Sequence, residues 1–400
     1  MLARRMLSNF ELRRTGISFF WIFIFLSFGI GMICFPVVVL RAARRGLEVW
    51  WEIVLPSLLP FFIISDLLMN LGFIAFFGTF LEPVMRPLFN LPGSGGFILA
   101  VSYLSGFPLC AVLTARLRQT NLCTKDEGER LLSFTSNASP LFMLGAVSAG
   151  MFQNPALGPL IAGIHYFSNF LCGVILKFFS RISPGHPPRS GMSKESLLAS
   201  ALRAFQKASR LKEQGFGALL GETIRSTTIT LLTIGGFITL FSVLLGILQA
   251  VGLFAAITRI LNPLAAFFNF DPSLFRPLLY GFFEITIGIN EASKVNGSLL
   301  QQLMMVEAIL AWNGLAVQAQ VAGMVAGTDL RILTYILTRF LQAAIAVSLT
   351  CIFTCSPVQA ILAISPRDPL VWAAVFLTGA ITFCIISFAR SFRKKVIIIR

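Results

Sequence analysis

Long apolar runs of helical length, separated by short polar or proline-containing turns, make up most of this chain. They fall near residues 17–40, 53–79, 94–117, 131–152, 156–180, 227–250, 252–269, 273–292, 303–326, 332–355 and 370–392. A helix that crosses the hydrocarbon core of a bilayer needs about 20 mostly apolar residues. The pattern therefore predicts an all-α protein, a polytopic membrane helix bundle of about 10 spans.

The two halves of the chain repeat the same order of features. Matching positions lie 178 to 180 residues apart: Gly72 with Gly252, Leu81–Pro83 with Leu261–Pro263, and Leu131–Phe134 with Ile309–Trp312. Weak internal repeats whose apolar segments are interrupted at corresponding places are typical of secondary transporters, in which the substrate site lies where the repeats meet. We therefore expect two membrane repeats with interrupted or re-entrant helices.

A single long hydrophilic segment, residues 181–225, separates the halves. Within it, apolar side chains recur at helical spacing with basic residues between them: Leu197, Leu198, Ala201, Leu202, Phe205 and Ala208. This pattern suits a helix on the inner membrane surface, and equally a solvated amphipathic linker. The predicted divisions are an N-terminal anchor span (1–45), a first repeat (46–180), a basic amphipathic cytoplasmic linker (181–225), a second repeat (226–355), and a C-terminal span with a basic tail (356–400).

Composition and charge agree with a membrane protein. Hydrophobic residues make up 56% of the chain and charged residues only 12%, whereas a soluble domain carries about 25% charged residues. The net charge of +15 comes from basic residues that flank the apolar runs, among them Arg4, Arg5, Arg13, Arg14, Arg203, Lys207, Arg210, Lys212, Arg390, Arg393, Lys394 and Lys395. Such flanks set orientation in a membrane, so we predict a multi-pass membrane protein that contacts the lipid bilayer and binds no nucleic acid.

The sequence holds little material for catalysis or for a metal centre. Its seven Cys are scattered, it has two His, and it contains no Cys-x-x-Cys pair, no Gly-x-Ser-x-Gly motif and no pair of membrane Asp residues. These absences argue against a metal site, a cofactor or an intramembrane enzyme. We therefore predict no catalytic residues, no metal and no cofactor.

Polar residues interrupt two apolar runs of the first half. The first interruption is Ser105–Pro108, where a proline and a glycine favour a kink or an unwound turn. The second is Thr135–Pro140, where Asn137 and Ser139 are candidates to line a cavity. Ser105, Asn137 and Ser139 are the predicted solute-binding residues of this half. Packing of a proline kink and hydrogen bonding between helices are the alternative roles.

Two segments of the second half correspond to these interruptions. Glu284 and Thr286 lie inside one apolar run, and Asn313, Gln318 and Gln320 lie in another. A charge at membrane depth is costly, so it faces the interior of the bundle or water. We predict that all five contact the solute, with Glu284 as the strongest candidate. A structural carboxylate paired with Arg, and amides that only pack, are the alternatives.

Six motifs are spread along positions 46–345: Leu55–Phe62, Leu81–Phe89, Ser105–Pro108, Asn137–Phe142, Glu284–Gly288 and Gln318–Val321. In this order they resemble the family of the sporulation integral membrane protein YlbJ. That family is similar to nucleoside-recognition, or gate, domain proteins, whose relatives include nucleoside transporters and iron-transport membrane proteins. In one departure, Ser136–Ala138 stands where the family pattern leads us to expect Asn-Asn-Gly, so one amide that would face a ligand is missing.

The resemblance implies a multi-pass inner-membrane protein of endospore-forming bacteria, located in the forespore or mother-cell membrane and required for spore cortex formation. Together with the polar interruptions, it favours a carrier of a small, nucleoside-like polar solute that works by alternating access. The alternative is a non-transporting membrane factor that recruits or assembles the machinery of spore envelope synthesis. The sequence leaves open whether the chain also binds copies of itself or other membrane proteins of sporulation.

Overall fold

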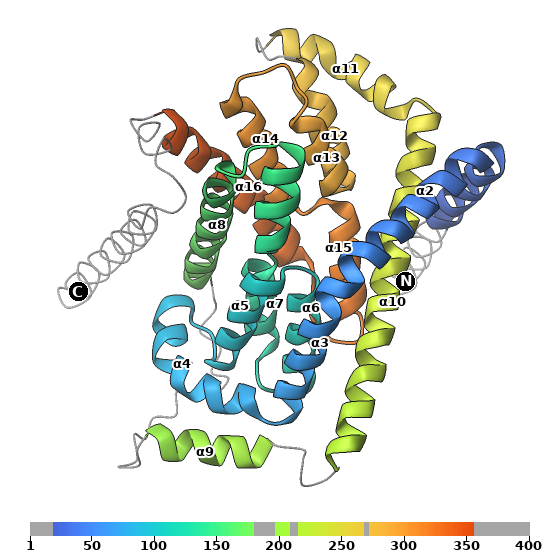
Figure 1. Cartoon of the computed structure of the whole chain (residues 1–400). Coiled ribbons are helices and arrows are strands. Elements are labelled where there is room, and N and C mark those ends of the chain that lie inside the picture. The colour runs from blue at the N-terminus through green and yellow to red at the C-terminus, as the bar shows by residue number, and fades with distance from the viewer. Residues whose placement is uncertain (1–18, 180–196, 209–214, 268–271, 356–400) are drawn as a thin grey trace, which may run out of the picture. The chain divides into compact units, whose positions relative to one another are not determined.

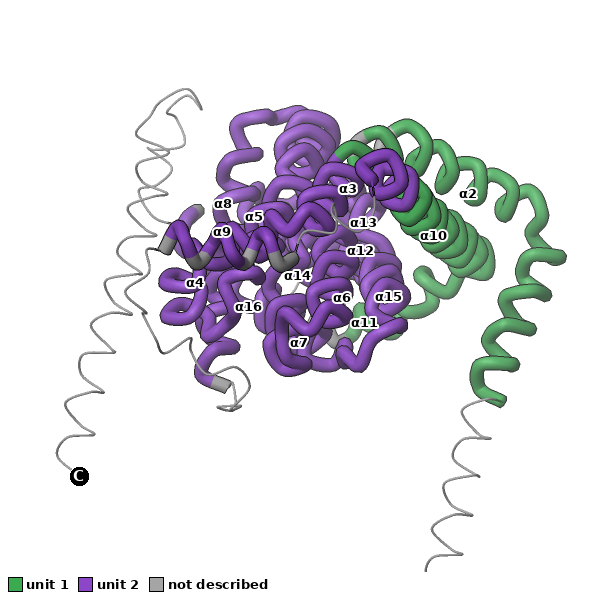
Figure 2. The backbone as a smooth tube through the Cα atoms, turned by 90° about the horizontal axis from the view of Figure 1, so that it is seen from below, with its two compact units in different colours: residues 1–60, 225–272 green, residues 61–224, 273–400 purple. Residues whose placement is uncertain are grey.

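The computed structural model describes residues 19–179, 197–208, 215–267 and 272–355, and these residues form helices and turns with no strand (Figure 1). The all-α membrane class predicted from the apolar runs is confirmed. The predicted span at 370–392 lies outside the described residues. The chain divides into two compact units: residues 1–60 with 225–272, called unit 1, and residues 61–224 with 273–400, called unit 2 (Figure 2).

Unit 1 contains the first membrane helices and most of a long helix from mid-chain. Its elements are the helix Phe19–Cys34, α2 (Pro36–Val49), the π-helix η1 (Trp50–Val54), α10 (Phe216–Ala250) from residue 225 onward, and α11 (Leu253–Phe267). The run 17–40, predicted to be one N-terminal span, is not one straight helix. The chain bends by 104° between the first helix and α2. Pro36 opens α2 and has no amide hydrogen to donate to the preceding turn, so the first helix ends at this point.

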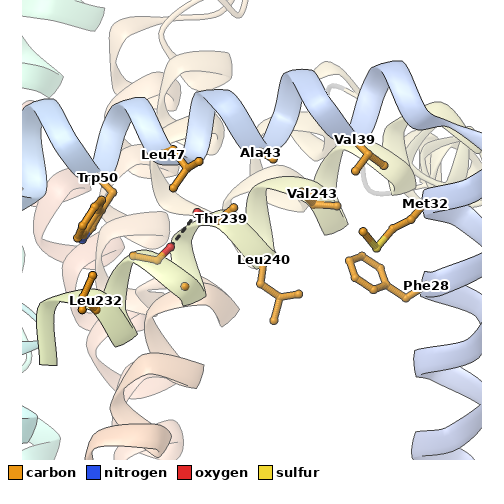
Figure 3. A pocket seen from close by; sticks show the side chains of 12 residues that line it. Phe28, Met32, Val39, Ala43, Leu47, Trp50, Leu232, Thr239, Leu240 and Val243 are labelled. Carbon is orange, nitrogen blue, oxygen red and sulfur yellow. Dashed lines mark hydrogen bonds between the residues drawn. The ribbon is translucent and has the colours of Figure 1, made fainter. Parts of the chain in front are cut away.

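Small residues let α2 and α10 approach closely within unit 1. A Cβ placed on Gly246 would lie 3.0 Å from the Ala42 side chain, and one placed on Gly235 would lie 2.7 Å from the Trp50 ring. The Trp50 indole donates a hydrogen bond to the Leu231 carbonyl at 2.9 Å. A groove of about 540 Å³ follows this seam, and apolar side chains such as Phe28 line most of it (Figure 3). Its lining does not suit a polar solute.

Unit 2 holds most of both predicted repeats. In chain order its helices are α3 (Leu55–Asn70) from residue 61, α4 (Phe73–Phe89), α5 (Ser94–Ser105), α6 (Leu109–Gln119), α7 (Lys125–Thr135), the π-helix η2 (Leu141–Met151), α8 (Leu157–Phe179), α9 (Leu197–Ala208), α12 (Phe275–Phe283), α13 (Ile285–Ala292), α14 (Leu299–Trp312), α15 (Gly314–Val325) and α16 (Leu333–Cys355).

The order of elements repeats along the chain. Both α3–α4 and α10–α11 are joined through a glycine in the left-handed region, Gly72 at φ 87° and Gly252 at φ 77°. Two interrupted helices follow in each half, and each half closes on an uninterrupted helix of 23 residues, α8 in the first and α16 in the second. The four interruptions fall in the polar segments that the sequence singled out.

Among the described residues, four helices are long and apolar enough to cross a membrane, one of them made of α14 and α15 together, or up to six if each of two bent helix pairs counts as one span. The other apolar runs are divided into shorter helices by their polar interruptions. A helix of 12 residues is only about 18 Å long, less than the hydrocarbon thickness. The structure therefore supports a helical membrane bundle, and the total of about 10 spans stays a prediction.

The amphipathic pattern in the linker does form a helix, α9, which packs against α4. The Phe205 ring meets the Phe76 ring edge to face, with centroids 6.3 Å apart. Leu198 and Leu202 lie on the same helix but remain 54% and 46% exposed. One part of the apolar stripe is thus covered by α4, and another part stays exposed.

The backbones of α12 and α13 approach closely at Gly288, so a side chain added there is expected to destabilise the protein. A Cβ on Gly288 would clash with the Gly281 backbone and lie 3.0 Å from the Pro277 carbonyl. Gly288→Ala is expected to lower stability by about 1–3 kcal/mol, because backbone atoms have no rotamer through which to yield. Gly163→Ala is the control, since nothing lies within 4 Å of its added Cβ. Thermal unfolding in detergent measures both, and equal midpoints for the two variants would contradict the tight crossing.

Candidate functional site

The two interruptions of the first repeat contact one another. The Phe107 amide donates to the Asn137 carbonyl at 2.8 Å. Gly106 adopts φ +79°, and a Cβ built there would lie 2.7 Å from the Ser139 nitrogen. The chain between α5 and α6 thus lies directly against the chain between α7 and η2. A side chain at Gly106 would push the two apart.

The two interruptions of the second repeat also contact one another. Asn313 and Gly314, where α14 ends and α15 begins, both adopt left-handed backbone conformations. A Cβ on Gly314 would lie 3.1 Å from the Phe283 carbonyl and 3.3 Å from the Glu284 Cα, at the tip of the α12–α13 hairpin. The second repeat therefore brings its own two polar segments together.

Asn313 links the two interruptions of the second repeat to those of the first. Its side-chain nitrogen lies 3.4 Å from the Ser136 carbonyl, 3.3 Å from the Ser136 hydroxyl and 3.2 Å from the Tyr335 hydroxyl, and the residue is fully buried. All four interruptions are therefore linked by contact within unit 2. We call residues 106–108, 136–140, 283–284 and 313–314 together the break centre.

Arg339 of α16 satisfies backbone groups that the interruption of α7 leaves without helical partners. Its guanidinium donates to the Ser136 carbonyl at 2.9 Å and to the Ser133 carbonyl, and it also reaches the side-chain oxygens of Asn169 and Gln342. The residue is 0% exposed. The last carbonyls of a helix carry partial negative charge, so a cation is favoured at that end. Arg130 binds the end of α4 in the same way: its guanidinium donates to the Phe89 and Asn90 carbonyls at 2.9 Å each.

Helix α8 supplies further partners to the same interruption. His165 Nε2 accepts from the Ala138 amide at 3.2 Å, and the Tyr166 hydroxyl donates to the Ala138 carbonyl at 3.1 Å. The Asn169 amide donates to the Asn137 side-chain oxygen and, at 2.6 Å, to the Phe134 carbonyl. Side chains of α8 and α16 therefore bind the backbone groups that have no helical partner at this interruption.

Four of the predicted solute-binding residues belong to the break centre. Asn137 and Asn313 are fully buried, while Ser139 and Glu284 are half-buried. The Ser139 hydroxyl accepts from the Phe142 amide at 3.2 Å, and the Glu284 carboxylate accepts from the Ile287 amide at 2.8 Å. Both side chains thus cap the helix that follows the interruption, where an acceptor meets free amides.

The other four predicted residues lie outside the break centre, and they differ in their hydrogen-bond partners. Thr286 interacts with the Glu284 carboxylate, and the Gln318 amide donates to the Trp312 carbonyl at 3.1 Å. The Ser105 hydroxyl donates back to the Val101 carbonyl of its own helix at 2.8 Å. Gln320 is buried on α15 and takes no part in the hydrogen bonds described for the break centre. A solute-binding role for any of the eight remains a prediction.

The sequence reasoning missed Arg339 and Tyr335, which lie inside the run 332–355. A lone Arg within an otherwise apolar span was a usable signal, since such a residue faces the bundle interior and needs partners. The alternative role considered for Glu284, pairing with Arg, finds no support among the described ion pairs: the nearby Arg276 pairs with Glu291 at 3.0 Å.

An ion pair and a hydrogen bond also connect the two repeats at the ends of their helices. Arg118, at the end of α6, binds both carboxylate oxygens of Asp329 at 2.9 and 3.1 Å, in the turn between α15 and α16. These hydrogen bonds hold the pKa of Asp329 below its usual range. The Glu129 carboxylate accepts from the Arg331 amide at 3.1 Å in the same turn. Because the first pair is exposed, it orients the turns and adds little stability.

The Arg339 contacts generate a prediction on stability. In Arg339→Lys a single ammonium replaces a guanidinium that serves two carbonyls and two side chains, so at least one buried acceptor loses its donor. Each such loss costs about 1–3 kcal/mol. We expect a clear drop in the unfolding midpoint in detergent, whereas the same exchange at the exposed Arg331 changes it little. An unaltered midpoint in Arg339→Lys would show that the interruption of α7 is stable without this cation.

The chain is similar in sequence to known proteins. The Gate family, described as nucleoside recognition, matches residues 51–164, a range that includes both interruptions of the first repeat. The chain is 42% identical over 315 residues to the sporulation integral membrane protein YlbJ of Bacillus subtilis (strain 168), which covers 79% of this chain and 77% of that protein. It is 34% identical over 110 residues to an uncharacterized protein of Alkalihalophilus pseudofirmus, covering 26% of this chain and 24% of that one. No solved structure matches the chain.

The first of these matches is high in identity and extends over most of both proteins. It takes in the segments on which the break centre is built. On this evidence the chain belongs to the family of the sporulation integral membrane protein YlbJ.

Proposed function

We propose that this protein carries a small, nucleoside-like polar solute across a membrane of the sporulating cell, and that the solute binds at the break centre. The observation that carries the proposal is the linkage of four helix interruptions from two repeats at one place in unit 2. Discontinuous helices that meet between repeats are the usual construction of transporter sites, because unwound backbone and helix ends offer polar groups to a substrate.

The chemistry of the break centre suits an uncharged polar solute with several donors and acceptors. Asn137 and Asn313 carry amides, which donate and accept at once. The side-chain oxygen of Asn313 has no hydrogen-bond partner among the described residues although it is fully buried. Half-buried Glu284 accepts hydrogen bonds, as sugar hydroxyls require. These groups match the base edge and the sugar of a nucleoside.

Aromatic side chains beside the break centre support the same solute class. Trp312 stacks on Phe282 with ring centroids 5.2 Å apart, and its indole donates to the Phe282 carbonyl at 2.9 Å. Stacking on an aromatic ring is favourable for any planar base, whatever its pattern of hydrogen-bond donors and acceptors. The match to a nucleoside-recognition family over residues 51–164 points in the same direction.

In the cell, we place this transport in the formation of the spore cortex. The support for sporulation as the setting is the similarity to YlbJ, whose name describes a sporulation membrane protein. On this proposal the solute is consumed on one side of a membrane that it crosses only through the carrier.

Transport in proteoliposomes tests the site. With a panel of radiolabelled nucleosides, Glu284→Gln and Asn137→Ala are expected to lower uptake at least about 10-fold, because losing one charged or buried hydrogen bond costs roughly 1.4 kcal/mol or more. Glu291→Gln is the control: it makes the same exchange at a carboxylate paired with Arg276 outside the break centre. Full uptake by both site variants would rule out this location for the solute.

The cellular role is tested by replacement of the chromosomal gene. A strain that makes only the Glu284→Gln protein is expected to form spores with a thin cortex in electron micrographs, whereas Glu291→Gln spores look normal. Membrane levels of both proteins are compared by immunoblotting. A normal cortex in the Glu284→Gln strain, with uptake abolished in proteoliposomes, would separate transport from cortex formation and favour an assembly role.

A further inference from the structure

Glu307 is a carboxyl group that the break centre does not use. It lies in α14 and is 0% exposed, and neither of its carboxyl oxygens has a hydrogen-bond partner among the described residues. Most buried polar groups in proteins are hydrogen-bonded. A carboxyl with both oxygens unpaired is therefore an exception that calls for an explanation.

The helices packed against α14 do not neutralise this group. These are α8, α12, α13 and α16. The hydrogen bonds, ion pairs and ring contacts described for the charged and titratable side chains of these helices join them to groups other than Glu307: Arg339 to the α7 carbonyls, Tyr335 to Asn313, His165 to Ala138, Tyr166 to Ala138, Lys177 to the Pro87 carbonyl, Arg276 to Glu291 and the Tyr280 ring, and Cys351 to Met304. Cys172 of α8 is buried and free, and Glu284 caps α13.

A carboxylate in such surroundings binds something positive. Leaving an isolated charge unpaired in an apolar interior is far more costly than binding a proton to it. A metal ion would need several oxygen ligands at once. The described residues offer no group of three or more acidic, His or Cys side chains that could hold a metal, and no other polar atom bonds the Glu307 oxygens. The chemistry therefore points to a proton.

The position of Glu307 connects it to the break centre. It lies six residues before Asn313 on the same helix, a rise of about 9 Å. Helix α14 ends at Asn313, whose left-handed backbone and bonds to Ser136 and Tyr335 make that end part of the break centre. When a solute replaces those bonds, the end of α14 is the part of the helix that must adjust.

We propose that Glu307 is the binding site for a proton whose uptake and release are coupled to solute binding at the break centre. In the step, a carboxylate oxygen takes a proton from hydronium, leaving water and a neutral acid, and the reverse reaction returns the proton. The coupling rests on the proposed carrier function. The binding of an exchangeable proton at Glu307 does not depend on that function.

Infrared spectroscopy of the full protein in lipid nanodiscs tests the proton site. At neutral pH the spectrum is expected to contain the carbonyl stretch of a protonated carboxyl that shifts in D₂O. The band should be absent in Glu307→Gln, displaced in Glu307→Asp and unchanged in the control Glu291→Gln. If Glu307→Gln fails to fold, the Asp variant still identifies the band. Absence of the band in the wild type, its survival in Glu307→Gln, or its insensitivity to D₂O would overturn the proposal.

Transport of uridine under an inward proton gradient tests the coupling. Wild-type proteoliposomes are expected to accumulate uridine against its gradient. Those with Glu307→Gln should lose accumulation while retaining exchange of internal for external uridine. Equal accumulation by both would overturn the coupling and leave the carrier intact. No uridine movement in the wild type, together with the expected infrared result, would overturn the coupling and count against the carrier while leaving the proton site.

Discussion

The fold of unit 2 depends on satisfying the backbone groups that are exposed where its helices stop inside the bundle. An unpaired amide or carbonyl in hydrocarbon costs several kcal/mol, so a helix can end at membrane depth only where protein or water supplies partners. Here side chains of the two uninterrupted helices supply them. Arg339 of α16 binds carbonyls at the end of α7, and His165 and Tyr166 of α8 bind the amide and carbonyl of Ala138.

This arrangement has a direct consequence for function. Hydrogen bonds within a continuous helix are not available to a ligand, but those made by side chains to an interrupted helix can be exchanged for bonds to a solute. Asn313 is the clearest case, because it bonds Ser136 across the repeats while its own side-chain oxygen has no partner among the described residues. On the proposed function, the cost of opening the break centre is offset only by a solute that presents matching donors and acceptors, and this requirement would be the physical basis of its selectivity.

The sequence predicted the helical membrane class and the positions of the interruptions well, because apolar runs and polar or proline-containing breaks are local signals. Its weaker predictions were those that depend on distant contacts. The bend at Phe35 depends on how Pro36 starts a new helix, and the role of Arg339 depends on the end of a helix about 200 residues earlier in the chain. Ser105 and Gln320 also show the limit: both are polar residues in the expected segments, yet Ser105 bonds its own helix and Gln320 lies outside the described network.

The central claim is that the break centre opens to water and holds the solute there. Thiol labelling in sealed vesicles addresses it most directly, with Ser139→Cys placed in a protein whose seven natural cysteines are replaced by alanine. Ser139 is half-buried at the start of η2, so a small maleimide needs only a modest opening to reach it. The account predicts that the thiol reacts with reagent supplied from either side, and that a bound nucleoside slows the reaction. A thiol that is inert from both sides, or labelling that no nucleoside changes, would contradict it.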